Sequence, residues 1–600
     1  MNNLQLGIKA HQQGQLQQAQ QYYLQHLSTA PKDPDARQLL GLVYSAQGDL
    51  NNAIANMQQS LSINSAQPHV LNNLGICQKN KGLFKEAISS FEKAIKQNKT
   101  YLDPYKNLIR LLLDTGAFSD VKSTLKQALK LFPNDVSIAK LNVDYYRDIE
   151  DHTKAIQLCE SLLLDYPDSV IFKHSLALNH RMAGNPARAL ELYNELEQSG
   201  FNKFQLFHNK ANALSDLGEQ RNAIEYYRKA ISLNPAFLES HVNLNELLWE
   251  LGDKTNFLAS YQEAFTQTPV TPELKFSYAS TLLRIGNFQA ALEFLHQLPE
   301  DHKNYYEYFD LLGRGLMDAG RESEAIEAQA HTQTFENVSA STSLNFAETL
   351  LRAGQYDRAE EVVQRTLKLE PENKHGWALQ GIIWEVKGDP NEAVLNDYDN
   401  LVREYTIEVP DGFDSVEQFC EQLNEYLATL HTSKRQPLEQ TLVGGTQSRG
   451  NLFNDSNVLV QALVEKFKLC INDYIEKTEP FVGRLPVLKG SEAFHFSGSW
   501  SVSLSGKGFH TQHVHPMGWL SSAFYVQLPH AVKDDQKKEG WFKLGEPSIA
   551  LPTPIQAKKY IKPVVGKLVL FQSYMWHGTI PFDADETRMT VAFDVAHGAK

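Results

Sequence analysis

A glycine returns every 34 residues across about the first two-thirds of the chain, and this spacing constrains the fold more than any other feature of the sequence. Eleven of the twelve positions reached from residue 14 in steps of 34 are glycine: Gly14, Gly48, Gly82, Gly116, Gly184, Gly218, Gly252, Gly286, Gly320, Gly354 and Gly388. Only Glu150 breaks the series. Glycine takes a positive φ without steric cost, so each one predicts a tight turn between two helices. A period of this length predicts a solenoid of stacked helical units.

Two further positions in each repeat support the prediction of helix pairs. Alanine stands five residues after the glycine position in ten of the twelve repeats, and proline stands seventeen residues after it in six. The alanine lets the second helix approach the first, and the proline ends the second helix before the next repeat begins. This pattern resembles the tetratricopeptide repeat. We therefore expect an all-α tetratricopeptide solenoid of about twelve repeats over residues 1–405.

An asparagine recurs on the predicted first helix, nine residues before the glycine position. It occurs in five repeats, as Asn73, Asn107, Asn209, Asn243 and Asn345. A carboxamide both donates and accepts hydrogen bonds, so a row of them on the concave face could hold an extended peptide. The alternative is that these asparagines are ordinary consensus residues that bind no ligand. The first interpretation predicts a peptide or protein partner for the solenoid.

Composition and charge restrict the class of partner. The chain has 57 Lys and Arg against 71 Asp and Glu, a formal net charge of −14, which argues against a nucleic-acid or anionic-membrane binder. No apolar run reaches about 18 residues, and the first residues lack the features of a signal peptide. The four cysteines, Cys77, Cys159, Cys420 and Cys470, are far apart and predict reduced, buried thiols. We expect a cytoplasmic protein; the sequence does not indicate its oligomeric state.

The 34-residue period ends near Arg403, and residues 406–600 predict a second domain. A short linker at 407–412 precedes two helical patterns, near 415–430 and 456–476, with Gly444 and Gly445 in the loop between them. Segments rich in β-branched and aromatic residues then predict strands at 494–504, 509–515, 519–528, 563–571 and 587–595. Several short strands after two helices indicate an α+β domain whose strands form a small sandwich or a jelly roll.

Three histidines within this domain have the spacing of a metal site. Alternate residues of a strand share one face, so His513 and His515 can bind the same ion, whereas His510 and His513 cannot easily do so. His577 follows a later apolar strand. Arg588 comes eleven residues after His577 and opens the last predicted strand. Its guanidinium could grip a carboxylate with two parallel hydrogen bonds.

An H-x-(D/E/H) pair, a distant histidine and an arginine about ten residues later resemble the iron(II)- and 2-oxoglutarate-dependent oxygenases. The segments 518–526, 540–547 and 571–577 also look like a bacterial 2-oxoglutarate oxygenase family that is often fused to tetratricopeptide repeats, and the resemblance spans about residues 412–597. It implies a double-stranded β-helix that uses Fe(II), 2-oxoglutarate and O2 as a dioxygenase. The implied reaction is hydroxylation of a peptide or protein that the solenoid recruits.

The resemblance also assigns residues. His513 and His577 would bind iron, Arg588 would bind 2-oxoglutarate, and Thr590 and Tyr525 would assist Arg588. His515 departs from the wider superfamily, where a carboxylate usually stands in its place. Residues 493–533 contain neither Asp nor Glu, so no carboxylate nearby in the sequence can replace it. Either His515 completes a three-histidine site, or water fills that position and His515 lies behind it.

Two other functions remain open at the level of sequence. The jelly roll could be a non-catalytic part of an interaction scaffold that senses a metal or 2-oxoglutarate. Alternatively, three histidines would suit zinc or manganese in a cupin-like metalloenzyme that does not use 2-oxoglutarate.

Overall fold

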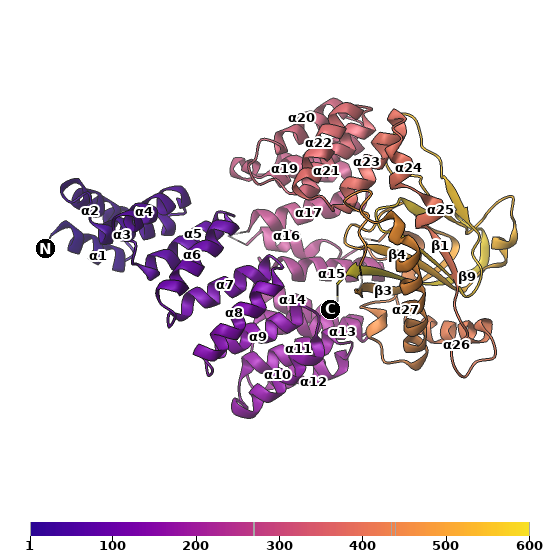
Figure 1. The fold of residues 1–600 in the computed structure, drawn as a ribbon, viewed down its shortest axis with the longest axis horizontal. Helices are drawn as coiled ribbons and strands as arrows, with labels where there is room; N and C mark the ends of the chain where they lie inside the picture. Colours follow the sequence, from indigo (N-terminus) through magenta and orange to yellow (C-terminus); the bar gives the residue numbers. More distant parts are fainter. Residues whose placement is uncertain (1, 268–269, 434, 439, 492, 599–600) are drawn as a thin grey trace. The chain divides into compact units, whose positions relative to one another are not determined.

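A computed structural model describes residues 2–267, 270–433, 435–438, 440–491 and 493–598. The chain divides into two compact units, Met1–Asn179 and His180–Lys600. Figure 1 shows antiparallel helix pairs over the first two-thirds of the chain and a strand-rich part, coloured orange to yellow, at its end. The predicted fold class, a tetratricopeptide solenoid followed by an α+β jelly-roll domain, is confirmed. The predicted boundary near residue 405 falls within strand β1 (Arg403–Thr406).

The first unit consists of helix pairs. Its helices are α1 (Asn3–Gln12), α2 (Leu16–Thr29), α3 (Pro34–Ala46), α4 (Leu50–Ile63), α5 (Pro68–Asn80), α6 (Phe84–Gln97), α7 (Leu102–Asp114), α8 (Phe118–Leu131), α9 (Val136–Asp148) and α10 (His152–Asp165), with the unit boundary falling inside α11 (Val170–Met182). Their ends follow from local chemistry. At α3, for example, the Asp33 carboxylate accepts hydrogen bonds from the first free backbone N–H groups, and Pro34 occupies the first turn, where no backbone donor is needed.

The second unit continues the same pattern. Its solenoid helices are α12 (Pro186–Gln198), α13 (Phe204–Asp216), α14 (Gln220–Leu233), α15 (Leu238–Leu251), α16 (Ala259–Phe265), α17 (Pro272–Arg284), α18 (Phe288–His296), α19 (Tyr306–Asp318), α20 (Glu322–Thr332), α21 (Ala340–Arg352), α22 (Tyr356–Leu369), α23 (Lys374–Lys387), α24 (Asn391–Leu395) and α25 (Tyr398–Leu401), with the 3-10 turn η1 (Glu300–Asn304). Within the described ranges, no helix combines the length and the apolar character that crossing a membrane requires.

The turn and contact positions of the repeat behave as the sequence predicts. All eleven glycines of the series have φ between 67° and 82°, and Glu150 adopts the same left-handed region with φ 58°. Nine of the ten alanines at the contact position are completely buried. The exception, Ala393, is exposed on the short helix α24, where the regular repeat ends.

Three asparagines of the predicted row connect neighbouring repeats. Asn107 donates to the Asn72 carboxamide oxygen at 2.9 Å, and Asn243 donates to Asn212 at the same distance. Asn345 donates to the Asp310 carboxylate at 3.1 and 3.2 Å. Asn73 and Asn209 occupy the equivalent position on α5 and α13. A peptide-binding role for the row remains a prediction, since at least three of these amides already have protein partners.

The C-terminal domain contains two antiparallel sheets. The larger has the order β1-β7-β4-β9-β3-β2 and the smaller β6-β5-β8. The strands after β1 are β2 (Leu442–Gln447), β3 (Phe494–His510), β4 (Leu520–Gln527), β5 (Phe542–Leu544), β6 (Lys559–Ile561), β7 (Lys567–Gln572), β8 (His577–Thr579) and β9 (Ala584–His597). Three 3-10 turns accompany them: η2 (Leu452–Asn454), η3 (Glu479–Phe481) and η4 (His530–Lys533).

Two helices cover one face of the larger sheet, as Figure 1 shows for α27. They are α26 (Val416–Ala428) and α27 (Val458–Thr478), which confirms the two helices predicted from the sequence. Phe419 and Phe467 from these helices are buried in one cluster with Phe593 from β9. The opposite face of the larger sheet turns toward the smaller sheet, where Phe571 and Phe542 pack together. This second face carries the candidate site.

Two details of the predicted domain were wrong. Residues 509–515 do not form a separate strand, because β3 runs on to His510 through a change of register near Gly506, and His513 forms only an isolated bridge with His577. Gly444 and Gly445 lie inside β2 instead of in a loop. A Cβ on Gly445 would lie 2.4 Å from the Ser503 carbonyl oxygen, so glycine permits this close pairing with β3.

Candidate metal and carboxylate-binding site

Three imidazoles converge between the two sheets. His513, His515 and His577 can each offer one nitrogen such that all three nitrogens lie within 4.8 Å of one another. The backbone holds two of them in place: His513 and His577 exchange N–H to carbonyl hydrogen bonds of 2.9 and 3.0 Å. His515 follows on the same loop, and its N–H donates to the Ser573 carbonyl at 2.8 Å. The structure thus brings together the three predicted ligands from two separate segments.

The hydrogen bonds of the rings fix which nitrogen is free. The Nδ1 atom of His513 lies 2.7 Å from the Thr511 carbonyl oxygen, and that of His577 lies 2.9 Å from the Met575 carbonyl oxygen. The Nδ1 atom of His515 lies 2.7 Å from the Asp594 carboxylate. These oxygens accept hydrogen bonds, so each Nδ1 is assigned the proton, and in a neutral ring the lone pair is then on Nε2.

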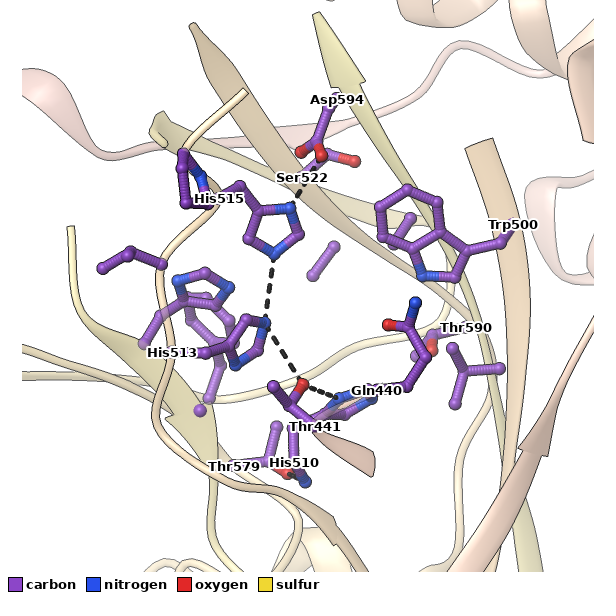
Figure 2. Close-up of a pocket in the computed structure, with 18 of the residues that line it drawn as sticks. Gln440, Thr441, Trp500, His510, His513, His515, Ser522, Thr579, Thr590 and Asp594 are labelled. Atoms are coloured by element: carbon purple, nitrogen blue, oxygen red, sulfur yellow. Dashed lines mark hydrogen bonds and ion pairs between the residues drawn. The ribbon is translucent and has the colours of Figure 1, made fainter. Parts of the chain in front are cut away.

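The free nitrogens point at one another. The Nε2 atoms of His513 and His515 are 3.0 Å apart, a contact marked in Figure 2. Two nitrogen lone pairs at this distance repel each other unless a proton or a metal ion lies between them. At a typical metal–imidazole bond length, two ligand nitrogens that bind one ion at a right angle lie about 3 Å apart. The donor set therefore fits a divalent transition metal.

Burial keeps two of the rings neutral. Removal from water lowers the pKa of His513 to about 3, with a further contribution from His515. Burial also places the pKa of His577 well below 6.5, and the neighbouring histidines add to the effect. Phe571 and Phe542 stand against the His577 ring, with ring centres 4.5 and 5.7 Å away, and form an apolar wall. Neutral imidazole is the form that binds a metal.

Arg588 points into the same cavity without a compensating charge. The residue is 2% exposed, and its Nη1 donates to the Gly540 carbonyl at 2.9 Å, while its buried Nε has no hydrogen-bond partner. Among the described residues, no carboxylate forms an ion pair with it. Burial lowers the pKa of Arg588, but a guanidinium remains charged at neutral pH. An unpaired buried cation is energetically costly, and an anionic ligand would compensate its charge.

Tyr525 and Thr590 accompany Arg588. The Tyr525 ring centre lies 5.2 Å from the guanidinium carbon, and the tyrosine hydroxyl is buried without a hydrogen-bond partner. Tyr525 on β4 is the register partner of Thr590 on β9, which lines the cavity. Tyr525 itself does not line the cavity but packs against Arg588. The cavity therefore contains five of the six residues predicted for the metal and for 2-oxoglutarate.

The cavity has a volume of about 380 Å³, within the range of small-molecule sites. Figure 2 shows Trp500, Gln440, Thr441 and His510 around it. Burial lowers the pKa of His510 well below 6.5, and the Thr441 hydroxyl lies 3.5 Å from its Nδ1 and 3.4 Å from the Nε2 of His513. His510 is not one of the three converging rings, in keeping with the expectation that it does not share the metal.

The sequence interpretation missed Asp594. Its carboxylate contacts His515, 79 residues earlier in the chain. A signal was present, since residues 588, 590, 592 and 594 alternate along β9 and all line the cavity. Residues 493–533 contain no carboxylate, as stated from the sequence, but the fold brings Asp594 to His515 from β9.

Comparison with known proteins agrees with the geometry. Residues 498–594 match the family model described as "Putative 2OG-Fe(II) oxygenase". Tetratricopeptide-repeat models match residues 34–67, 80–141, 204–237 and 344–406. These two kinds of match agree with the family resemblance described from the sequence.

Several individual proteins are similar to parts of this chain. The TPR repeat-containing protein YpiA of Bacillus subtilis is 22% identical over 354 residues, which cover 56% of this chain and 78% of YpiA. The crystal structure of yeast Tom70 shares 16% identity and covers 66% of this chain and 91% of its own, with a TM-score of 0.34. The crystal structure of a tetratricopeptide repeat protein from Parabacteroides merdae shares 15% sequence identity. The match covers 39% of this chain and 92% of that protein, with a TM-score of 0.35. The chain thus joins tetratricopeptide repeats to a region, residues 498–594, that matches the "Putative 2OG-Fe(II) oxygenase" family model.

Proposed function

We propose that this protein is an Fe(II)- and 2-oxoglutarate-dependent dioxygenase, a hydroxylase that acts in the cytoplasm on a peptide or protein recruited by its solenoid. One observation carries the proposal. Three imidazoles with free Nε2 atoms and one buried guanidinium without an acidic partner share a single cavity. A divalent metal satisfies the first group, and a dicarboxylate satisfies the second.

The residues divide into two sets. His513, His515 and His577 would hold the metal through Nε2. Arg588 would bind the carboxylate of 2-oxoglutarate that lies far from the metal, with the Tyr525 hydroxyl as a further donor and Thr590 beside them. When bound, iron and 2-oxoglutarate together supply oxidative decarboxylation by O2, which yields succinate and carbon dioxide and oxidises a C–H bond of the substrate.

Aromatic side chains pack against the histidine rings of the proposed metal site. Phe571 and Phe542 keep water from the face of His577 that they cover. The ring of Trp500 stacks on that of His515, with an angle of 12° between their planes. Low polarity around the rings strengthens the attraction between Arg588 and a carboxylate. These features support a partly apolar site in which the co-substrate is oriented before the reaction.

The position of the second unit's solenoid supports a role in recruitment. Asn243 and Asn212 line a neighbouring cavity of about 270 Å³ on the inner helices of the repeats. Gln440 lines both that cavity and the metal cavity. A peptide held along Asn212 and Asn243 would therefore lie next to the entrance of the proposed active site.

Succinate production tests the proposal. Purified protein with Fe(II), ascorbate and 2-oxoglutarate should form succinate, and candidate peptides should increase the rate. His577→Ala should abolish turnover, whereas His495→Ala, which removes a histidine hydrogen-bonded to the Gly598 carbonyl, should retain it. Equal succinate formation by wild type and His577→Ala would contradict the assignment.

A zinc or manganese enzyme without 2-oxoglutarate is the second candidate, since three neutral histidines also suit these ions. Calorimetric titration of the metal-loaded protein with 2-oxoglutarate separates the two. Binding that depends on Arg588 supports the oxygenase. Metal uptake without any 2-oxoglutarate binding favours the other metalloenzyme.

A further inference from the structure

Asp594 is the acidic residue on the wall of the metal cavity. It is on β9, and its side chain is 15% exposed. Figure 2 shows its carboxylate on the far side of the His515 ring from His513. One oxygen accepts from the His515 Nδ1 at 2.7 Å. Asp594 therefore contacts the proposed metal ligand His515 on the side of the ring that faces away from the proposed metal.

The carboxylate is held from its other side. Its second oxygen accepts a hydrogen bond of 2.6 Å from the Ser521 hydroxyl. Ser521 in turn lies 2.9 Å from the Ser573 hydroxyl, and both serines are almost completely buried. Gly518 leaves room for this arrangement, because a Cβ there would lie 2.6 Å from the Ser573 hydroxyl. The side chain of Asp594 is thus fixed by its own set of contacts.

His515 differs from the other two rings in the charge behind it. His513 and His577 each donate Nδ1–H to a neutral backbone carbonyl, whereas His515 donates to a carboxylate. A carboxylate behind a ligating imidazole fixes the ring and makes its free nitrogen a stronger donor to the metal. His515 is also the ligand that stands where the wider superfamily has an acid.

We propose that Asp594 is a positioning residue that restores this missing negative charge. Asp594 and His515 act as one anionic ligand, with the charge one hydrogen bond away from the metal instead of directly on it. The inference rests on the proposed metal site and makes His515 a direct ligand, in place of water. It predicts that Asp594 affects metal affinity and the electronic state of the metal, beyond any effect on folding.

Asp594→Asn is the variant that tests this. Asparagine has the same shape and can still accept from Nδ1 through its carbonyl oxygen, so the substitution removes the charge and keeps the ring in place. Asp585→Asn is a matched control, because Asp585 is an exposed carboxylate on the same strand. Fe(II) affinity would be measured anaerobically by calorimetry on the full chain, together with the absorption band of the Fe(II) protein with 2-oxoglutarate.

Asp594→Asn should bind Fe(II) about 10- to 100-fold more weakly than wild type, the range typical of partners behind a metal ligand. Its absorption band should move to shorter wavelength, because an electron is harder to transfer to 2-oxoglutarate from a more positive iron. A purely structural role would lower thermal stability and leave the band where it is. Asp585→Asn should match wild type in both measurements.

The inference fails if folded Asp594→Asn binds Fe(II) as tightly as wild type with an unshifted band. If the wild type takes up no metal, the proposed metal site itself fails. Should Asp594→Asn not fold, Ser521→Ala replaces it, since it releases one carboxylate oxygen and leaves the charge. Ser521→Ala should weaken Fe(II) binding a few-fold, and unchanged binding would overturn the inference.

Discussion

The buried hydroxyl of Tyr525 is a sensitive probe of the anion site. Burial raises the pKa of Tyr525 to about 12, so the group is protonated at neutral pH and can donate to a carboxylate. A hydrogen bond to a charged group is worth about 1.5–3 kcal/mol. Tyr525→Phe should therefore weaken 2-oxoglutarate binding by about 10-fold or more, as measured by calorimetry.

Tyr574→Phe is the control for this experiment. Tyr574 is also buried, but its hydroxyl already donates to the Leu395 carbonyl at 2.5 Å, whereas the Tyr525 hydroxyl has no hydrogen-bond partner. Its loss should cost about 1 kcal/mol of stability and leave 2-oxoglutarate affinity unchanged. If Tyr525→Phe binds 2-oxoglutarate like wild type, the hydroxyl is not a ligand.

Among the individual site residues, those that belong to a recognisable sequence motif could be predicted from the sequence. His513, His515, His577 and Arg588 are recognisable because their spacing along the chain reflects the chemistry they serve. Asp594 was not recognisable in this way. It meets Ser521 because the two are register partners on β4 and β9, and register between strands far apart in sequence is set by packing of the whole sheet.

Among the elements, the helix-to-helix turns of the solenoid can be tested one at a time. A Cβ on Gly116 would meet no atom within 4 Å, so its φ of 70° is the only obstacle to a side chain. Gly116→Ala should destabilise the first unit by about 1 kcal/mol, which chemical denaturation can measure. Glu150→Gly, at the equivalent turn with φ 58°, should relieve the corresponding strain. A stability loss in Glu150→Gly as large as in Gly116→Ala would contradict this explanation of the period.

The pair of helices α13 and α14 contains a pH-sensitive residue. His208 accepts a hydrogen bond from the Asn212 amide through Nε2 and contacts the Ser240 hydroxyl through Nδ1. Burial lowers the pKa of His208 to about 4, helped by the positive charge of Arg181. Below about pH 6.5 the unfolded chain gains a proton here that the folded chain does not, so stability falls as the pH drops toward 4.

His208→Gln isolates this contribution, because glutamine does not titrate. The melting temperature of wild type should fall more steeply between pH 7 and pH 5 than that of the variant. Parallel curves for the two proteins over this range would show that His208 does not contribute to the acid sensitivity.

Helices and strands could be predicted where their sequence patterns are long or repeated. The helix pairs follow from twelve copies of one signal, and α26 and α27 from clear helical periodicity. Strands β5, β6 and β8 have three residues each, too few to show an alternation. The predicted strand at 509–515 failed because a β-rich composition cannot show where β3 stops pairing.

In the second unit, the solenoid and the site domain share one hydrophobic core. Trp377, Leu395 and Leu401 from the repeats are buried in the same cluster as Phe542 and Tyr574 from the site domain. Each such side chain contributes about 2 kcal/mol when buried, against a total stability of about 5–15 kcal/mol for a typical domain. We therefore expect the C-terminal domain to depend on the last repeats for its stability.

A truncation series tests this dependence. A chain that begins at Val170 keeps the shared cluster and should unfold cooperatively and bind metal. A chain that begins at Thr406 exposes the buried faces of Phe542 and Tyr574 and should aggregate or melt at a much lower temperature. Equal melting temperatures for the two chains would show that the shared cluster does not stabilise the site domain.

The anaerobic absorption spectrum tests most directly whether one cavity binds both iron and 2-oxoglutarate. The Fe(II) protein with 2-oxoglutarate should develop a visible band that is lost in Arg588→Ala, while Arg588→Ala still binds Fe(II) through its three histidines. A wild-type protein that binds Fe(II) but gives no band with 2-oxoglutarate, or a band that is unchanged in Arg588→Ala, would contradict the claim.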